Sequence, residues 1–290
     1  VVCGLLLGGM LLIVAFFIRE ARAEFPLIHL PVLAQRPVLM GALLISLYGF
    51  GSTATGFLLP DFLTRVQGLR DLQIGDVLNW IALPQFFIVP LAAVLLRWVD
   101  ARLLLLVGFS MISFGSWLNT GLTHDWAGPD FLPSQIVEAV GLAFGVTALV
   151  TYAVAHITPP QAAAIAATIQ IARLLGAEIG SAGIQTFVRV REQTYSNLIG
   201  LHVKTGGAKT LGAAAQFATP FDTRQTAHTD PTLQGFRVLA NLVQREAYVL
   251  AYIDAFWLIT WVLLAGVVSL VLLRAPPPNP MTPPRITPPR

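Results

Sequence analysis

Seven long apolar segments constrain the fold of this chain more than any other feature of its sequence. Each segment is 18 to 27 residues long and holds at most two charged side chains. A helix of about 20 residues crosses the ~30 Å hydrocarbon core of a bilayer, and there it satisfies its own backbone amides. The sequence therefore predicts an all-α, polytopic membrane protein with about seven transmembrane helices. The segments lie at 1–18, 38–60, 77–96, 103–123, 133–156, 162–188 and 249–273.

The composition agrees with this fold class and excludes several functions. The chain is 55% hydrophobic and 11% charged, whereas soluble domains are about 25% charged. An ordinary soluble enzyme, a disordered protein and a nucleic-acid binder are therefore excluded. The five histidines and the single cysteine are scattered without the spacing of metal ligands, so we expect no metal site and no cofactor.

The apolar segments also divide the chain into four parts. In order, we expect a truncated transmembrane helix, a cytoplasmic loop, a six-helix unit and a proline-rich cytoplasmic tail, at 1–18, 19–37, 38–275 and 276–290. A long outer loop at 189–248 interrupts the six-helix unit. Its two ends, 189–202 and 233–245, have helical character, whereas the tail is too rich in proline to pack.

Arginine is unevenly distributed between the two sides of the predicted membrane. In an alternating topology, the segments 19–37, 97–102 and 274–290 share one side and hold eight arginines. The short connections 61–76 and 124–132 on the other side hold two. Because cytoplasmic loops are enriched in Lys and Arg, the sequence predicts that the C-terminus is cytoplasmic.

Four charged side chains fall inside the predicted helices: Glu138, Arg173, Glu178 and Asp254. Ionisable groups within a membrane are costly and commonly mark ion or substrate pathways. We therefore take Glu178, Glu138 and Asp254 as candidates for proton coupling. The alternatives are a structural ion pair for Glu138, a position at the membrane interface for Asp254, and a structural clamp for Arg173.

Polar and small residues near these charges supply further candidates. The candidates for lining a substrate cavity are Arg173, Gln170, Gln85, Tyr48 and Tyr152. Gly176 and Gly180 form a GxxxG step, which lets another helix approach closely. The short cytoplasmic loop with Arg97, Asp100 and Arg102 is a candidate charge relay, and simple anchoring by the positive-inside rule is the alternative.

Four stretches of the sequence carry a resemblance to a transporter family. They are an outer connection, a basic cytoplasmic turn, a glycine-rich span, and the last loop with its span, at 60–76, 97–102, 170–183 and 189–257. In the glycine-rich span, Arg173, Gly176 and Gly180 match an R-x-x-G-x-x-x-G pattern. The chain thereby resembles the C-terminal half of a major facilitator superfamily transporter, and more narrowly the fourteen-span drug:proton antiporter branch of the EmrB/QacA type.

This resemblance implies a fold and an activity. The last six spans would form one transporter half built from 3+3 inverted repeats, and the segment 1–18 would be the last linker helix. The helices that begin near 38, 77, 133 and 162 would line the cavity. The chain would be the C-terminal portion of a secondary active transporter, not an enzyme. It would export amphipathic toxicants by proton-coupled alternating access across the bacterial inner membrane.

The implied partners are the lipid bilayer, the N-terminal transporter half, an amphipathic small-molecule substrate and protons. In Gram-negative bacteria the resemblance adds a periplasmic adaptor and an outer-membrane channel, and it implies no nucleic acid. Two alternatives stay open. One is a carrier of another substrate, such as a siderophore or a peptide, because a fold does not fix a substrate. The other is a seven-span membrane sensor or scaffold that does not transport.

Overall fold

The computed structural model describes residues 2–22, 36–155, 162–202, 212 and 231–270. In this part of the chain the regular secondary structure is helical, which confirms the predicted all-α class. Most of the predicted loop 19–37, all of the tail 276–290 and the middle of the outer loop fall outside the described residues.

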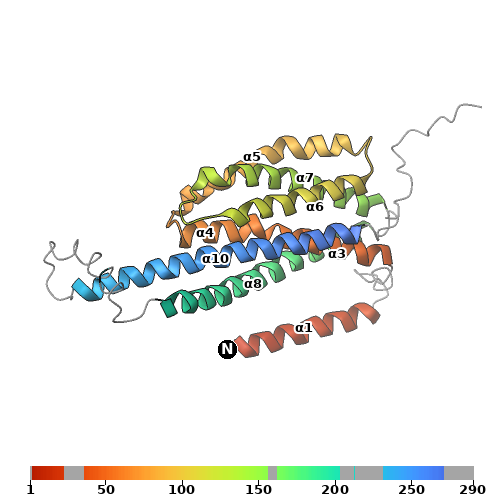
Figure 1. The fold of residues 1–290 in the computed structure, drawn as a ribbon. Coiled ribbons are helices and arrows are strands. Elements are labelled where there is room, and N and C mark those ends of the chain that lie inside the picture. The colour runs from red at the N-terminus through yellow and green to blue at the C-terminus, as the bar shows by residue number, and fades with distance from the viewer. Residues whose placement is uncertain (1, 23–35, 156–161, 203–211, 213–230, 271–290) are drawn as a thin grey trace, which may run out of the picture.

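The helices run roughly along one common direction (Figure 1). In chain order they are α1 (Val2–Arg22), α3 (Arg36–Gly51), α4 (Leu59–Arg65), α5 (Asp71–Leu95), α6 (Ala101–Leu118), α7 (Leu132–Ala155), α8 (Ala162–His202) and α10 (Pro231–Leu270). A π-helical turn at Ala54–Leu58 joins α3 to α4. Short 3₁₀ turns at Asn119–Gly121 and Gly128–Phe131 end α6 and precede α7.

Five stretches of the described residues are long and apolar enough to cross a membrane. They are Leu39–Arg65, Asp71–Leu95, Ala101–Gly121, Gly128–Thr151 and Gly235–Leu270. In α1 the described apolar stretch is shorter, at Leu7–Phe16. The helix α8 carries Arg173 and Glu178 and is not among the five. A polytopic helical membrane protein therefore follows from the structure as it does from the sequence.

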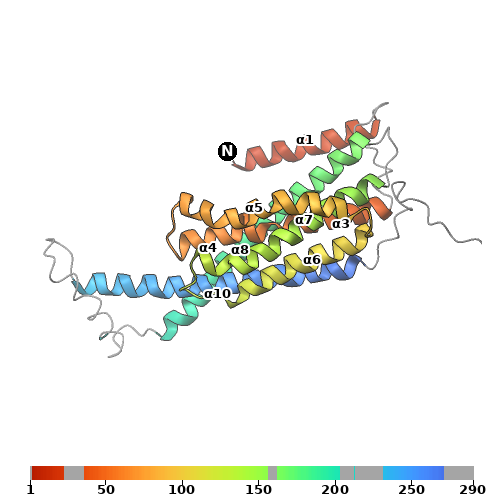
Figure 2. The ribbon, with the colours of Figure 1, turned by 90° about the horizontal axis from the view of Figure 1, so that it is seen from above.

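Helices that are distant in the sequence pack against one another. The helix α3 lies against α8, α5 against α7, and α6 against both α7 and α10, while α10 also contacts α8. Seen from above, these helices form one bundle, and α1 lies at its periphery (Figure 2). The helix α5 remains a single helix across Pro84 and Pro90. Only 17% of its most apolar stretch is buried within the bundle. Its side chains Phe86 and Phe87 are exposed.

Aromatic side chains fill the bundle near the end that carries Asp61, called the Asp61 end below. Phe62 of α4 meets Phe131 and Tyr252 edge-on, with ring centroids 5.6 and 5.5 Å apart. All three side chains are fully buried. Edge-to-face aromatic pairs add about 0.5–1.5 kcal/mol beyond the area that they bury. This cluster therefore fixes α4, the start of α7 and α10 relative to one another.

Glycines allow the closest helix contacts in the bundle. A Cβ added at Gly176 of α8 would meet the backbone carbonyl of Ser46 in α3, and one added at Gly49 would meet that of Arg173. At Gly180 the added atom would meet the side chains of Phe50 and Thr53. Small residues let transmembrane helices approach this closely. The two glycines of the GxxxG step therefore lie in the contact between α3 and α8.

The helices α8 and α10 are longer than a membrane is thick. They contain 41 and 40 residues, or ~60 Å at 1.5 Å per residue, about twice the hydrocarbon core. Both extend past the other helices at the Asp61 end (Figure 1). The described parts of the predicted outer loop, 189–202 and 231–248, are thus unbroken continuations of two helices. The predicted start of the last span near residue 249 is not a helix end.

Candidate functional site

The charged and polar side chains in the middle of α8 lie at the surface of the bundle. Arg173 is half-buried, and its Nε donates a hydrogen bond to Oε1 of Gln170 at 3.3 Å. The Glu178 side chain is exposed, and no hydrogen bond or ion pair among the described residues reaches its carboxylate. This carboxylate therefore lies on an open face of the bundle, at the middle of a predicted span.

The exposed face of α8 continues from Glu178 toward the Asp61 end. Ala182, Gln185 and Arg189 follow Glu178 at steps of four, seven and eleven residues, and all are exposed. Such steps place side chains on one side of an α-helix. A polar stripe thus runs along α8 from the middle of the predicted span to its end. This stripe is called the α8 stripe below.

Tyr48 packs between helices. Its side chain is buried, and its hydroxyl donates a hydrogen bond to the carbonyl oxygen of Leu142 at 3.1 Å. The neighbouring Ser46 hydroxyl donates to the carbonyl oxygen of Ala172 at 2.9 Å. These bonds tie α3 to α7 and to α8. Gln85 lies half-buried on α5, and the side chain of Tyr152 is outside the described residues.

Glu138 is the most deeply buried of the predicted candidates, at 1% exposure. It accepts one hydrogen bond, from the Ser116 hydroxyl of α6 at 3.2 Å. The amide of Gln135 and the side-chain oxygen of Asn119 are also buried and make no hydrogen bond with a described residue. Buried polar groups normally have partners. Sequence reasoning found Glu138 by its charge but missed these uncharged residues. Their only signal was spacing: Gln135 precedes Glu138 by three residues on α7, and Asn119 follows Ser116 by three residues, in the turn that ends α6.

Asp254 is held by the part of α8 that extends beyond the predicted span. Its Oδ2 accepts hydrogen bonds from Nε and Nη2 of Arg191, both at 2.6 Å, and from the Tyr195 hydroxyl at 2.8 Å. The hydrogen bond to Asp254 raises the pKa of Tyr195. Asp254 thus has a cationic partner, and in this structure it joins α10 to α8.

A second set of polar contacts surrounds Asp61. One carboxylate oxygen accepts from Nε of Arg65 at 2.8 Å, and the other accepts from the Tyr252 hydroxyl at 2.6 Å. Nη1 of Arg65 lies 3.5 Å from the Tyr248 hydroxyl. Asp61 and Tyr252 are 191 residues apart in the sequence. Sequence reasoning missed this network because no local pattern connects its members.

We expect the bond between Asp61 and Tyr252 to stabilise the Asp61 end. Hydrogen bonds to charged groups contribute about 1.5–3 kcal/mol, and Tyr252 is fully buried. A double-mutant cycle with Tyr252→Phe and Asp61→Asn, followed by unfolding in detergent, should give a coupling free energy in that range. Tyr248→Phe is the matched control, because its 3.5 Å contact with Arg65 is long, and it should cost less than about 1 kcal/mol. A coupling near zero for Tyr252 would contradict the expectation.

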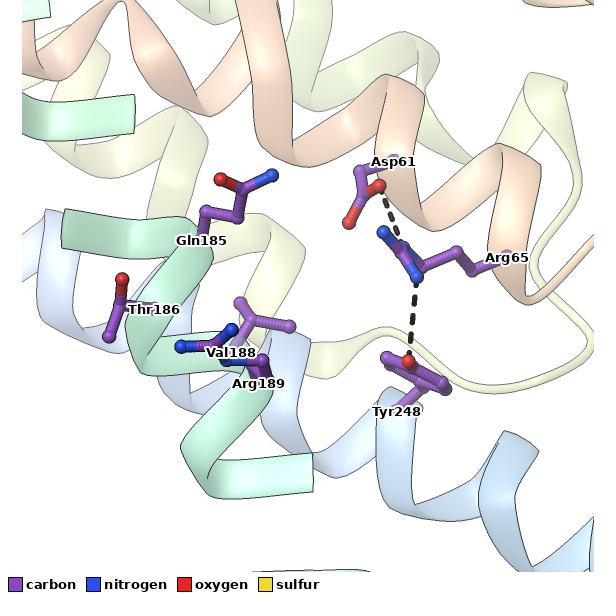
Figure 3. A pocket seen from close by; sticks show the side chains of 7 residues that line it. All are labelled: Asp61, Arg65, Gln185, Thr186, Val188, Arg189 and Tyr248. Carbon is purple, nitrogen blue, oxygen red and sulfur yellow. Dashed lines mark hydrogen bonds and ion pairs between the residues drawn. The ribbon is translucent and has the colours of Figure 1, made fainter. Parts of the chain in front are cut away.

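The same end of the bundle contains a pocket of about 280 Å³. Figure 3 shows Asp61 and Arg65 of α4 on one side, residues of α8 opposite them, and Tyr248 of α10. The lining residues are Asp61, Arg65, Gln185, Thr186, Val188, Arg189 and Tyr248. Two of them, Gln185 and Arg189, belong to the α8 stripe, so the stripe ends in this pocket.

The predicted charge-relay loop lies at the start of α6, at the end of the bundle opposite the Asp61 end. Arg97 and Asp100 are exposed, and Asp100 precedes the first residue of α6 without capping it by its side chain. Arg102 is half-buried, and its Nε and Nη2 are buried without a hydrogen-bond partner in the part of the chain that the structure describes. Across the described residues no ion pair joins these three side chains. Nor does the described part of the chain contain a group of three metal-ligating side chains.

Comparison with known proteins finds a sequence similarity to a resistance protein. No protein-family model matches the chain. The chain is 27% identical over 180 residues to the colistin resistance protein EmrB of Acinetobacter baumannii. The match covers 62% of this chain and 34% of the relative, so the chain spans about a third of that protein's length. The similarity to the EmrB type of transporter, predicted from the sequence, is thus confirmed.

Proposed function

We propose that this chain is the C-terminal portion of a proton-coupled multidrug efflux transporter. In this proposal the complete protein exports amphipathic toxicants by alternating access. The chain supplies one six-helix half, and the N-terminal half faces the middle of α8, around Glu178. Drug export and membrane location agree with the similarity to a colistin resistance protein. The proposal also includes proton coupling, a location in the inner membrane and a cytoplasmic C-terminus.

The position of Glu178 is the observation that carries this proposal. The helix α8 contacts α3 and α10, and Glu178 points away from those contacts because it is exposed. A charged side chain near the middle of a membrane is costly against lipid, so it normally faces a bundle interior or an aqueous cavity. The face that carries Glu178 therefore suits a water-filled cavity between two transporter halves.

Transport itself is the first test. The full-length protein that contains this chain would be produced in an efflux-deficient bacterial host loaded with a fluorescent amphipathic cation. We expect export that stops when a protonophore is added. In potassium buffer, nigericin removes the pH gradient and valinomycin removes the membrane potential. We expect nigericin to inhibit export strongly, because proton antiport draws on the pH gradient.

Two results would contradict the proposal. Export that continues in the presence of the protonophore would exclude proton coupling. Failure to export any of a panel of amphipathic compounds, with the protein present in the membrane at normal levels, would favour the other two functions. These are a carrier of a different substrate, such as a siderophore or a peptide, and a membrane sensor. The periplasmic adaptor and outer-membrane channel would be sought by co-purification in the same host.

A further inference from the structure

We propose that the pocket at the Asp61 end binds a phosphate group, and that the phosphate is carried by a phospholipid headgroup. The assignment to a lipid rests on the proposed function, which places Glu178 near the middle of the membrane. The proposal is argued from the charge of the pocket, from its unpaired donors, from its polar lining and from the distance along α8 between Glu178 and Arg189.

The pocket offers hydrogen-bond donors and a net positive charge. Its ionisable lining consists of one carboxylate, Asp61, and two guanidinium groups, Arg65 and Arg189. Both oxygens of Asp61 already accept hydrogen bonds, from Arg65 and from Tyr252. Asp61 thus neutralises Arg65, and the charge of Arg189 remains. A ligand that enters this pocket would meet donors with little competing negative charge.

Two side chains of the α8 wall have no partner in the described part of the chain. Neither the Arg189 guanidinium nor the Gln185 amide takes part in a hydrogen bond or an ion pair with a described residue. Both lie on the same face of α8, opposite Arg65 (Figure 3). Guanidinium groups bind phosphate through paired, charge-assisted hydrogen bonds. The unpaired donors of this wall therefore match the oxygens of a phosphate.

The depth of the pocket favours a lipid headgroup as the source of the phosphate. Arg189 follows Glu178 by eleven residues, which corresponds to ~16 Å along a helix. Half of the hydrocarbon core is ~15 Å thick. The proposed function places Glu178 near the middle of the membrane, and Arg189 then lies where the hydrocarbon ends and the phosphates of the lipids begin.

The polar lining of the pocket separates this ligand from a transported drug. Sites for drug-sized molecules usually measure about 300–1,000 Å³ and are mostly apolar. This pocket measures about 280 Å³ and is lined mainly by polar and charged side chains. A headgroup can enter it while the acyl chains stay outside, among the exposed apolar side chains of neighbouring helices.

The test measures lipid binding by the full-length protein that contains this chain, purified in detergent. The probes are dioleoyl phosphatidylglycerol, dioleoylglycerol, which has the same acyl chains without phosphate, and inorganic phosphate. Retained lipid is counted by native mass spectrometry, and the thermal unfolding midpoint is recorded. We expect phosphatidylglycerol to bind and to raise the midpoint, and dioleoylglycerol to do neither.

Variants of exposed arginines make the test specific to the pocket. Arg189→Gln should weaken phosphatidylglycerol binding about tenfold, and Arg189→Lys should retain part of the affinity, because it keeps the charge and loses the paired geometry. Arg237→Gln is the matched control, since Arg237 is an exposed arginine of α10 that does not line the pocket. It should leave binding unchanged.

Three outcomes would overturn the proposal in whole or in part. Equal binding of the two lipids would show that acyl chains, and not phosphate, are recognised. Equal weakening by Arg189→Gln and Arg237→Gln would show general charge attraction and no site. Binding of millimolar inorganic phosphate without binding of phosphatidylglycerol would support phosphate recognition and overturn its assignment to a lipid.

Discussion

Glu178→Gln should reduce proton-driven export about 5- to 150-fold, the range that typical coupling free energies between two sites produce. Glutamine keeps the size and polarity of glutamate but cannot exchange a proton. Glu178 is exposed on the bundle, so its replacement removes no packing contact. The variant should therefore reach the membrane at wild-type levels. Its defect should appear in dye export measured with an imposed pH gradient.

Two variants serve as controls for this prediction. Glu178→Asp keeps a titratable carboxylate and should retain part of the activity. Asp76→Asn replaces an exposed carboxylate near the start of α5, and export should stay near the wild-type rate. If Glu178→Gln exports normally while Glu138→Gln does not, the coupling role moves to the buried carboxylate of α7. If both export normally, the coupling carboxylate lies elsewhere in the complete protein.

Gly176→Ala should destabilise the bundle by about 1–3 kcal/mol, the usual cost of overpacking a close contact. The added Cβ would meet the backbone carbonyl of Ser46. A backbone group cannot rotate away as a flexible side chain can, so α3 and α8 would have to separate. We expect a lower thermal unfolding midpoint in detergent and a smaller yield of monodisperse protein.

Gly183→Ala is the matched control on the same helix. Among the described residues, no atom outside the backbone of its own helix turn lies within 4 Å of a Cβ added at Gly183, and alanine favours a helix over glycine by up to about 1 kcal/mol. This variant should therefore leave the unfolding midpoint unchanged or raise it. Replacing glycine by alanine is therefore expected to lower the unfolding midpoint at position 176, but not at position 183, seven residues further along the same helix. Equal effects at both positions would contradict the packing assigned to Gly176.

The contact between α3 and α8 shows how far sequence reasoning reached. The GxxxG step at Gly176 and Gly180 is local, and it predicted a close helix contact without saying which helix would provide it. The structure shows α3 as the partner and adds Gly49, whose Cβ would meet the backbone of Arg173. These glycines act together, because each helix can approach the other closely only where the facing residue has no side chain.

Asp254 shows where sequence reasoning was incomplete. Its position inside a predicted span made it a candidate for proton coupling. The structure places Arg191 and Tyr195 against it, because α8 continues as a helix beyond the predicted span and carries these two side chains to α10. The predicted span ended at residue 188 because the apolar character ends there. Apolar character alone does not show that the helix continues beyond that residue.

The sequence by itself determined that this is a helical membrane protein, and it predicted the similarity to the EmrB type of transporter. In hydrocarbon each backbone amide must find its partner within its own segment, so the length and apolar character of each segment predict a helix locally. The tertiary structure decided which polar groups meet. Asp61 with Tyr252, Glu138 with Ser116, and the pocket that ends the α8 stripe all depend on how helices pair and rotate about their axes. Those choices depend on packing between segments far apart in the chain, and no single segment encodes them.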